Sequence, residues 1–267
     1  MNFIEAFILG IIQGLTEFLP VSSSGHLELA KSMFNSQALP QESLLFTVIL
    51  HGATALSTIV VFKDDIMEIL KRGLKPEWNE NSQYIVKIII SMIPAAFVGV
   101  FFKEEIETLF SGWILLVGIM LLITGLLLLL ADKAQKTIKS VGFLNSLFIG
   151  IAQAVAILPG ISRSGATIST SVLLGINRDK AARFSFLMVI PLILIKTLKD
   201  ILEITFFSKS VEHTEWSVLL IGFAAAFLSG LFACKWMLAI VRNSKLVYFA
   251  LYCFVIGGGA VFSVLVY

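Results

Sequence analysis

Charged residues are scarce in this chain of 267 residues, of which only 14% are Asp, Glu, Lys or Arg. A soluble domain carries about 25%. Hydrophobic residues make up 57% of the chain, and the mean hydropathy is +0.93. The formal net charge is only +2 and no basic stripe stands out, which argues against a nucleic-acid partner. The composition therefore excludes an ordinary soluble domain and predicts a polytopic membrane protein.

Cysteine is also rare. The two cysteines, Cys234 and Cys253, lie in apolar segments, which favours buried packing over a disulfide or a metal pair. The first residues lack both a basic region and a small-residue cleavage site. We therefore expect no removable signal peptide.

Long apolar runs predict six membrane-spanning helices. These lie at about 44–62, 84–102, 112–131, 183–203, 216–236 and 246–266. The charged segments at 63–75 and 103–105 are expected to be loops between spans.

Two further apolar stretches are too short to cross the membrane in one helix. Residues 3–34 are interrupted by a polar tip after Pro20, and residues 143–175 are interrupted after Pro159. A break at membrane depth is tolerated only inside protein or beside water. Each stretch is therefore expected to form a re-entrant hairpin of two half-length helices.

The two hairpin stretches share a pattern. Gly10 to Gln13 (GIIQ) match Gly150 to Gln153 (GIAQ), and the pair Ser24-Gly25 matches Ser164-Gly165. We predict an all-α membrane protein of one domain, 1–267, in which residues 1–131 and 140–267 are repeats. Each repeat has one hairpin and three spans, so the second repeat is expected to be inverted. The two tips would then meet inside the membrane.

Positive charge is distributed unequally across the predicted spans. One side holds 5 lysines, at 31, 103, 196, 199 and 209. The other side holds 13 residues: Lys63, Lys71, Arg72, Lys75, Lys133, Lys136, Lys139, Arg178, Lys180, Arg183, Lys235, Arg242 and Lys245. The positive-inside rule assigns the richer side to the cytoplasm, which leaves both termini and the entrance of the first hairpin outside.

The first tip combines a carboxylate with hydroxyl and imidazole groups. Gln13 and Glu17 are four residues apart and share a helix face, where their oxygens suit Mg²⁺ or Ca²⁺. The alternative is a buried carboxyl paired with a neighbour. His26 follows a serine triplet that would either cap the next helix or provide a nucleophile with His26 as its base. The triplet is Ser22, Ser23 and Ser24, followed by Gly25.

The second tip is suited to an anion. Gly160 precedes Ser162, Arg163, Ser164, Gly165 and Thr167 at the start of a half-length helix, whose free amides attract negative charge. The Arg163 guanidinium fits phosphate oxygens, and the Ser162 and Thr167 hydroxyls add donors. The alternative is a structural bridge between Arg163 and Glu17. His51 is a weaker candidate for lining the entrance, since a satisfied core histidine is the commoner case.

Two long motifs resemble the undecaprenyl-diphosphatases of the bacitracin-resistance type. They are Gln13 to His26 (QGLTEFLPVSSSGH) and Pro159 to Thr167 (PGISRSGAT), and the resemblance in length and span pattern covers the whole chain. It implies a bacterial cytoplasmic-membrane phosphatase that converts undecaprenyl diphosphate to the monophosphate for cell-wall synthesis and confers bacitracin resistance. It also implies a divalent cation, Mg²⁺ or Ca²⁺, and a site open to the periplasmic or outer face.

The resemblance also implies roles for particular residues. Glu17 matches the essential glutamate, and Gln13 stands where the family has Glu or Gln, so both are expected to hold the cation. Ser23 and His26 match residues with nucleophile or base roles, and the attacking group is left open between a serine, His26 and water. The expected phosphate-binding set is Ser162, Arg163, Ser164 and Thr167, supported by Ser22, Ser24, Gly25, Gln153, Gly160 and Gly165.

The alternative reading is a lipid-carrier flippase or an anion transporter, because inverted repeats with broken helices are common in transporters. His26 and the serine triplet favour hydrolysis, since transport does not need them. The expected partners are the lipid substrate and the surrounding membrane lipid, with a homodimer left open.

Overall fold

The computed structural model describes residues 2–33, 40–109, 113–207, 215–243 and 245–266, and every regular element within them is an α-helix. Lys209 and the first residue of the span predicted at 112–131 lie outside the described residues. Five described helices are long and apolar enough to cross a membrane. They are α5 (Glu80–Phe101), α7 (Ile114–Asp132), α10 (Arg178–Phe207), α11 (Trp216–Arg242) and α12 (Val247–Val266). The predicted all-α integral membrane protein is confirmed.

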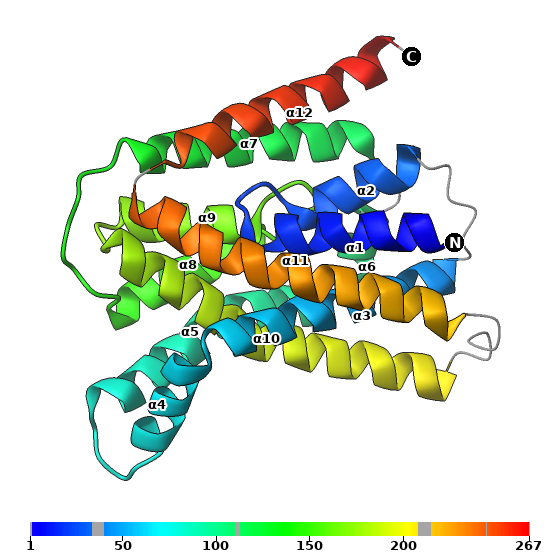
Figure 1. Ribbon diagram of the computed structural model, residues 1–267. Helices are drawn as coiled ribbons and strands as arrows, with labels where there is room; N and C mark the ends of the chain where they lie inside the picture. The colour runs from blue at the N-terminus through cyan, green and yellow to red at the C-terminus, as the bar shows by residue number, and fades with distance from the viewer. Residues whose placement is uncertain (1, 34–39, 110–112, 208–214, 244, 267) are drawn as a thin grey trace.

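The first predicted span is a bent pair of helices. The helix α3 (Pro40–Val61) is followed after one residue by α4 (Lys63–Gly73), and the two meet at an angle of 74°. Taken together, the two helices are long and apolar enough to form a sixth span. Figure 1 shows α4 projecting sideways from the bundle.

The prediction of loops at 63–75 and 103–105 was wrong, because helices begin in both segments. The segment after α3 is the helix α4, and Lys103–Leu109 form α6. Both helices have acidic residues in the first turn, and α4 also has basic residues in its last turn. This order of charges complements the helix dipole, so a charged segment at a membrane surface need not be irregular.

Each predicted hairpin is a pair of short helices. The first contains α1 (Phe3–Phe18) and α2 (Ser23–Met33), and the second contains α8 (Phe143–Val155) and α9 (Arg163–Leu173). The first pair enters the bundle from the end that carries both chain termini, whereas the second enters from the opposite end (Figure 1). Both turns therefore lie within the bundle rather than at its surface.

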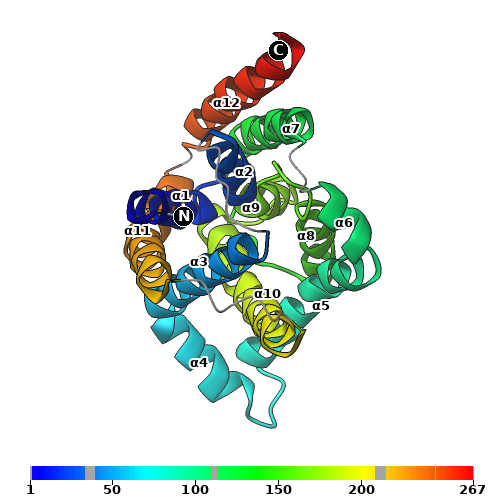
Figure 2. The same ribbon diagram turned by 90° about the vertical axis from the view of Figure 1, so that its right-hand side faces the viewer.

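The hairpins pack against spans from distant parts of the sequence. Helix α1 lies along α11, and α8 lies along α5, so each hairpin packs on the other half of the chain. Viewed along the bundle, α12 lies at the outer edge, next to α7 (Figure 2). An inverted duplication would produce this packing, in which each hairpin lies against the other half of the chain. The duplication itself stays a prediction.

Candidate active site

The tips of the two hairpins touch inside the bundle, as the sequence predicts. A Cβ atom added to Gly25 would lie 3.2 Å from the Gly160 Cα atom, and one added to Gly165 would lie 3.3 Å from the Pro20 side chain. The Ser164 hydroxyl also donates to the Leu19 carbonyl at 3.3 Å. Glycine at these positions therefore lets the two backbones approach closely.

The second turn is held by a threonine that the sequence analysis did not identify. Gly160 has φ +95°, a left-handed conformation that favours glycine. Thr124 on α7 donates its hydroxyl to the Gly160 carbonyl at 3.2 Å and accepts the Ser162 amide at 3.1 Å. Ser162 in turn caps α9, because its side chain accepts the Gly165 amide at 3.0 Å. The start of α9 is thereby fixed beside the first tip.

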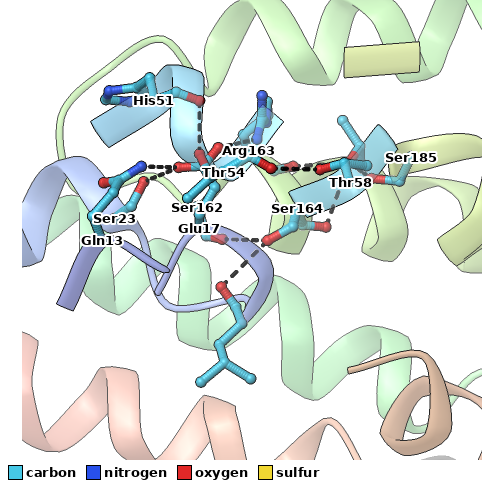
Figure 3. Close-up of polar contacts among 12 residues, drawn as sticks. Gln13, Glu17, Ser23, His51, Thr54, Thr58, Ser162, Arg163, Ser164 and Ser185 are labelled. Atoms are coloured by element: carbon cyan, nitrogen blue, oxygen red, sulfur yellow. Dashed lines mark hydrogen bonds and ion pairs between the residues drawn. The ribbon is translucent and has the colours of Figure 1, made fainter. Parts of the chain in front are cut away.

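An ion pair joins the two tips at the centre of the site (Figure 3). The Arg163 Nη2 atom donates to Oε1 of Glu17, which is only 7% exposed. Gln13 and Ser23 both donate to the other oxygen, Oε2, at 2.9 Å and 2.7 Å. One buried carboxylate thus gathers four of the predicted site residues, counting itself.

The sequence suggested a serine nucleophile with His26 as its base, whereas in the structure Ser23 and His26 have different partners. Ser23 donates to Glu17, whereas the His26 Nδ1 atom lies 2.8 Å from the Ser22 carbonyl oxygen. The His26 Nε2 atom lies 2.8 Å from the Tyr252 hydroxyl on α12. Both ring nitrogens of His26 are therefore engaged without a serine hydroxyl.

Ser22 shapes the first turn through an uncommon backbone conformation. Its φ of +69° makes it the one positive-φ residue other than glycine among those the structure describes. The Ser22 hydroxyl accepts the Gly25 amide at 3.3 Å and lies 3.4 Å from the Ser24 hydroxyl. Ser22 and Ser24 therefore organise the start of α2, and Ser23 is the member of the triplet that reaches Glu17.

Two predicted site residues serve the second hairpin instead of reaching the ion pair. The buried Thr167 hydroxyl donates to the Arg163 carbonyl at 2.8 Å and lies 2.5 Å from the Ser185 hydroxyl on α10. Gln153 donates to the Ser91 carbonyl on α5 at 3.5 Å. Thr167 thus anchors α9 against α10, and Gln153 joins α8 to α5.

Helix α3 contributes polar residues that the sequence analysis ranked low or missed. The close-up in Figure 3 labels His51, Thr54 and Thr58 on α3, and both threonines are buried. The His51 Nδ1 atom bonds the Thr47 carbonyl at 2.8 Å. The recurrence of polar residues three or four apart in an apolar span is the signal that would have pointed to this face of α3.

The oxygens around Glu17 fit a hard divalent cation. The Gln13 Oε1 atom is buried and has no hydrogen-bond partner within the described part of the chain. It belongs to the same side chain that donates to Glu17, so an amide oxygen and a carboxylate lie together. The described residues contain no cluster of three His, Cys, Asp or Glu side chains. Phosphate oxygens would have to supply further ligands, as is usual for Mg²⁺.

Comparisons with known proteins find similarity along almost the whole chain. A family model described as bacitracin resistance protein BacA matches residues 6–259. The chain is 60% identical over 261 residues to an undecaprenyl-diphosphatase of Christiangramia forsetii, covering 98% of both chains. It is 47% identical to an undecaprenyl-diphosphatase of Bacteroides fragilis, and the match covers 96% of both chains. It is 42% identical to an undecaprenyl-diphosphatase of Carboxydothermus hydrogenoformans, and the match covers 96% of this chain and 95% of the relative.

Proposed function

This chain belongs to the bacitracin resistance protein BacA family and dephosphorylates undecaprenyl diphosphate, and we propose that the joined hairpin tips carry out this reaction. The observation that carries the proposal is the ion pair between Glu17 and Arg163, with Ser23 bonded to the same carboxylate. It brings an anion-binding group and a hydroxyl nucleophile to one point inside the membrane.

Arg163 is the proposed phosphate-binding residue. The Arg163 side chain is 24% exposed and the Glu17 side chain is 5% exposed, so Arg163 is the accessible member of the pair. A planar guanidinium can donate to Glu17 and to a phosphate oxygen at the same time. The amide groups at the start of α9 add positive potential at the same place. Phosphoryl transfer depends mainly on such positioning and charge stabilisation.

Ser23 is the proposed nucleophile. Its hydroxyl already donates to Glu17 at 2.7 Å, so the carboxylate can accept the proton as the serine oxygen attacks the terminal phosphorus. The bond from that phosphorus to the bridging oxygen breaks, and undecaprenyl phosphate leaves. Water then hydrolyses the phosphoserine, which releases inorganic phosphate and restores the Ser23 hydroxyl. His26 lies three residues further along α2 and is proposed to exchange a proton with the substrate.

Gln13 and Glu17 are the proposed ligands of a divalent cation, Mg²⁺ or Ca²⁺. When bound, such an ion supplies positive charge that neutralises phosphate oxygens. The unpartnered Gln13 Oε1 atom supports this assignment, because a buried amide oxygen without a partner is otherwise costly.

The proposed location is the bacterial cytoplasmic membrane, with the site open to the outer side. The excess of lysine and arginine at the end of the bundle that carries α4 supports this orientation. A membrane-impermeant maleimide tests it, because both native cysteines are buried. In intact cells, exposed Glu215→Cys should react and exposed Lys75→Cys should not. The reverse pattern would contradict the proposed orientation.

A phosphate-release assay tests the activity itself. Purified protein in detergent is given undecaprenyl diphosphate with Mg²⁺, with Ca²⁺ or with a chelator. We expect cation-dependent release of one inorganic phosphate per lipid, and loss of release in Arg163→Ala. Lipid that remains as the diphosphate under every condition would refute the proposed function.

A further inference from the structure

The His26 ring makes a contact that the proposed mechanism does not explain. The imidazole ring stacks on the phenol ring of Tyr252, with the ring centroids 5.5 Å apart and an angle of 12° between the ring planes. The His26 Nε2 atom lies 2.8 Å from the Tyr252 hydroxyl. The two residues are 226 positions apart in the sequence. This contact ties the first hairpin tip to α12, which otherwise packs along α7.

The neighbouring residue strengthens the attachment of α12 to the tip. The Cys253 thiol lies 3.8 Å from the Pro20 carbonyl oxygen, in the turn that precedes α2. Two consecutive residues of α12 thus contact the tip at two separate points. Tyr252 is 42% exposed, and Leu251 beside it is 56% exposed. The stacked His26 and Tyr252 rings therefore lie at an exposed edge of the site.

The hydrogen bonds of His26 define its tautomer. A carbonyl oxygen only accepts, so the Nδ1 atom must carry the proton that is donated to Ser22. The Nε2 atom of the neutral ring is then the basic nitrogen, and it accepts the Tyr252 hydroxyl proton. The strained Ser22 backbone, with φ +69°, directs the carbonyl that imposes this choice.

A tyrosine hydroxyl can serve both protonation states of the ring. It donates to Nε2 of the neutral imidazole, and after a rotation it accepts from Nε2–H of the imidazolium. The stacked phenol ring holds the imidazole plane in both states. Because neutral Nε2 has one lone pair, the hydroxyl turns away from it when Nε2 takes a proton, and the stacked phenol ring keeps His26 in place during the exchange.

We propose that Tyr252 is a positioning residue that holds the His26 ring, with Nε2 as its basic atom, at the exposed edge of the site. This inference rests on the proposed function, because it requires His26 to exchange a proton during hydrolysis. Tyr252 acts through His26 and is not itself placed on the reacting phosphate.

The test removes only the hydroxyl. In Tyr252→Phe, kcat for undecaprenyl diphosphate should fall about threefold to tenfold, the range expected for loss of one hydrogen bond. The KM should change by less than about twofold, because Tyr252 does not bind the phosphate. Tyr248→Phe is the matched control on the same helix, since Tyr248 is 65% exposed and is placed outside the site. Its kcat should equal that of the wild type.

A double-mutant cycle shows whether Tyr252 acts through His26. In a His26→Gln background, Tyr252→Phe should cause no further loss of rate. An equal loss in both backgrounds, or a wild-type kcat in Tyr252→Phe, would overturn the inference while leaving the phosphatase activity established. A wild-type protein that releases no phosphate would instead refute the proposed function.

A spectroscopic readout covers the case in which His26→Gln is too slow to measure. In ¹⁵N-histidine-labelled protein, the His26 signals are those lost in His26→Gln. At neutral pH they should show a protonated Nδ1, and the Nε2 signal should move in Tyr252→Phe but not in Tyr248→Phe. A protonated Nε2 with a bare Nδ1, or an Nε2 signal unaffected by Tyr252→Phe, would overturn the inference.

Discussion

Ser23 on α2 donates its hydroxyl to the Glu17 Oε2 atom at 2.7 Å, and the same carboxylate binds Arg163 through its other oxygen. The proton acceptor nearest to this serine is therefore a carboxylate on the other arm of its own hairpin. This relationship makes Glu17 the link between the proposed nucleophile and the proposed phosphate-binding arginine, and four predictions depend on it or on the packing behind it.

Ser23→Ala should lower kcat by at least about 100-fold, because the proposed phosphoserine cannot form. The variant should keep its fold, since the lost side chain is only partly buried. Rapid quenching of wild-type enzyme with substrate labelled in its terminal phosphate should trap label on Ser23. Ser263→Ala, which removes a hydroxyl at the far end of α12, is the control and should be fully active. Substantial turnover in Ser23→Ala would show that water attacks directly.

Arg163→Lys should lower kcat/KM by about 100-fold or more. Lysine keeps the charge but loses the planar fork that can contact Glu17 and phosphate together. Arg183→Lys is the matched control, because Arg183 is also paired with carboxylates, those of Asp65 and Asp179, but away from the hairpin tips. Phosphate release by the purified variants provides the measurement. Wild-type turnover in Arg163→Lys would remove this side chain from the mechanism.

Gln13→Glu should lower the Mg²⁺ concentration needed for half-maximal activity by about tenfold. A second carboxylate would replace a neutral amide oxygen in the proposed cation site, and the charge of the ligands sets such affinities. Gln13→Ala should shift the requirement in the opposite direction. Titrations of activity against Mg²⁺ compare the three proteins, and identical midpoints would argue that Gln13 does not hold the cation.

Gly14→Ala should destabilise the protein by about 1–3 kcal/mol. A Cβ atom there would lie 2.0 Å from the Ser229 hydroxyl and 2.4 Å from the Ala226 carbonyl oxygen, so α1 would have to move away from α11. Gly99→Ala in α5 is the control, because nothing lies within 4 Å of its added Cβ atom. Thermal unfolding in detergent should show a lower Tm for Gly14→Ala alone. Equal Tm values would mean that the α1–α11 contact adapts to the extra methyl group.

Several features of the fold were within reach of sequence reasoning because their signals are local. Apolar runs of spanning length predict α5, α7, α10, α11 and α12, and short apolar runs with a polar break predict the two hairpins. Local signals were less reliable for α4 and α6. Charge alone suggested loops there, whereas acidic residues in the first turn of both segments, and basic residues in the last turn of α4, favour a helix.

The sequence by itself pointed to Gln13, Glu17, Ser23 and Arg163 as residues that meet, because polar groups in an apolar chain must face one another or water. Glu17 and Arg163 are the clearest case, since neither has a tolerable place in lipid. Only the tertiary structure decided the hydrogen bonds within that set. Ser23 bonds Glu17 while His26 turns to Tyr252, and Thr124 holds the second turn. The physical reason is that a hydrogen bond depends on tenths of an ångström, and these distances are set by how α1 packs on α11 and α12 on α7.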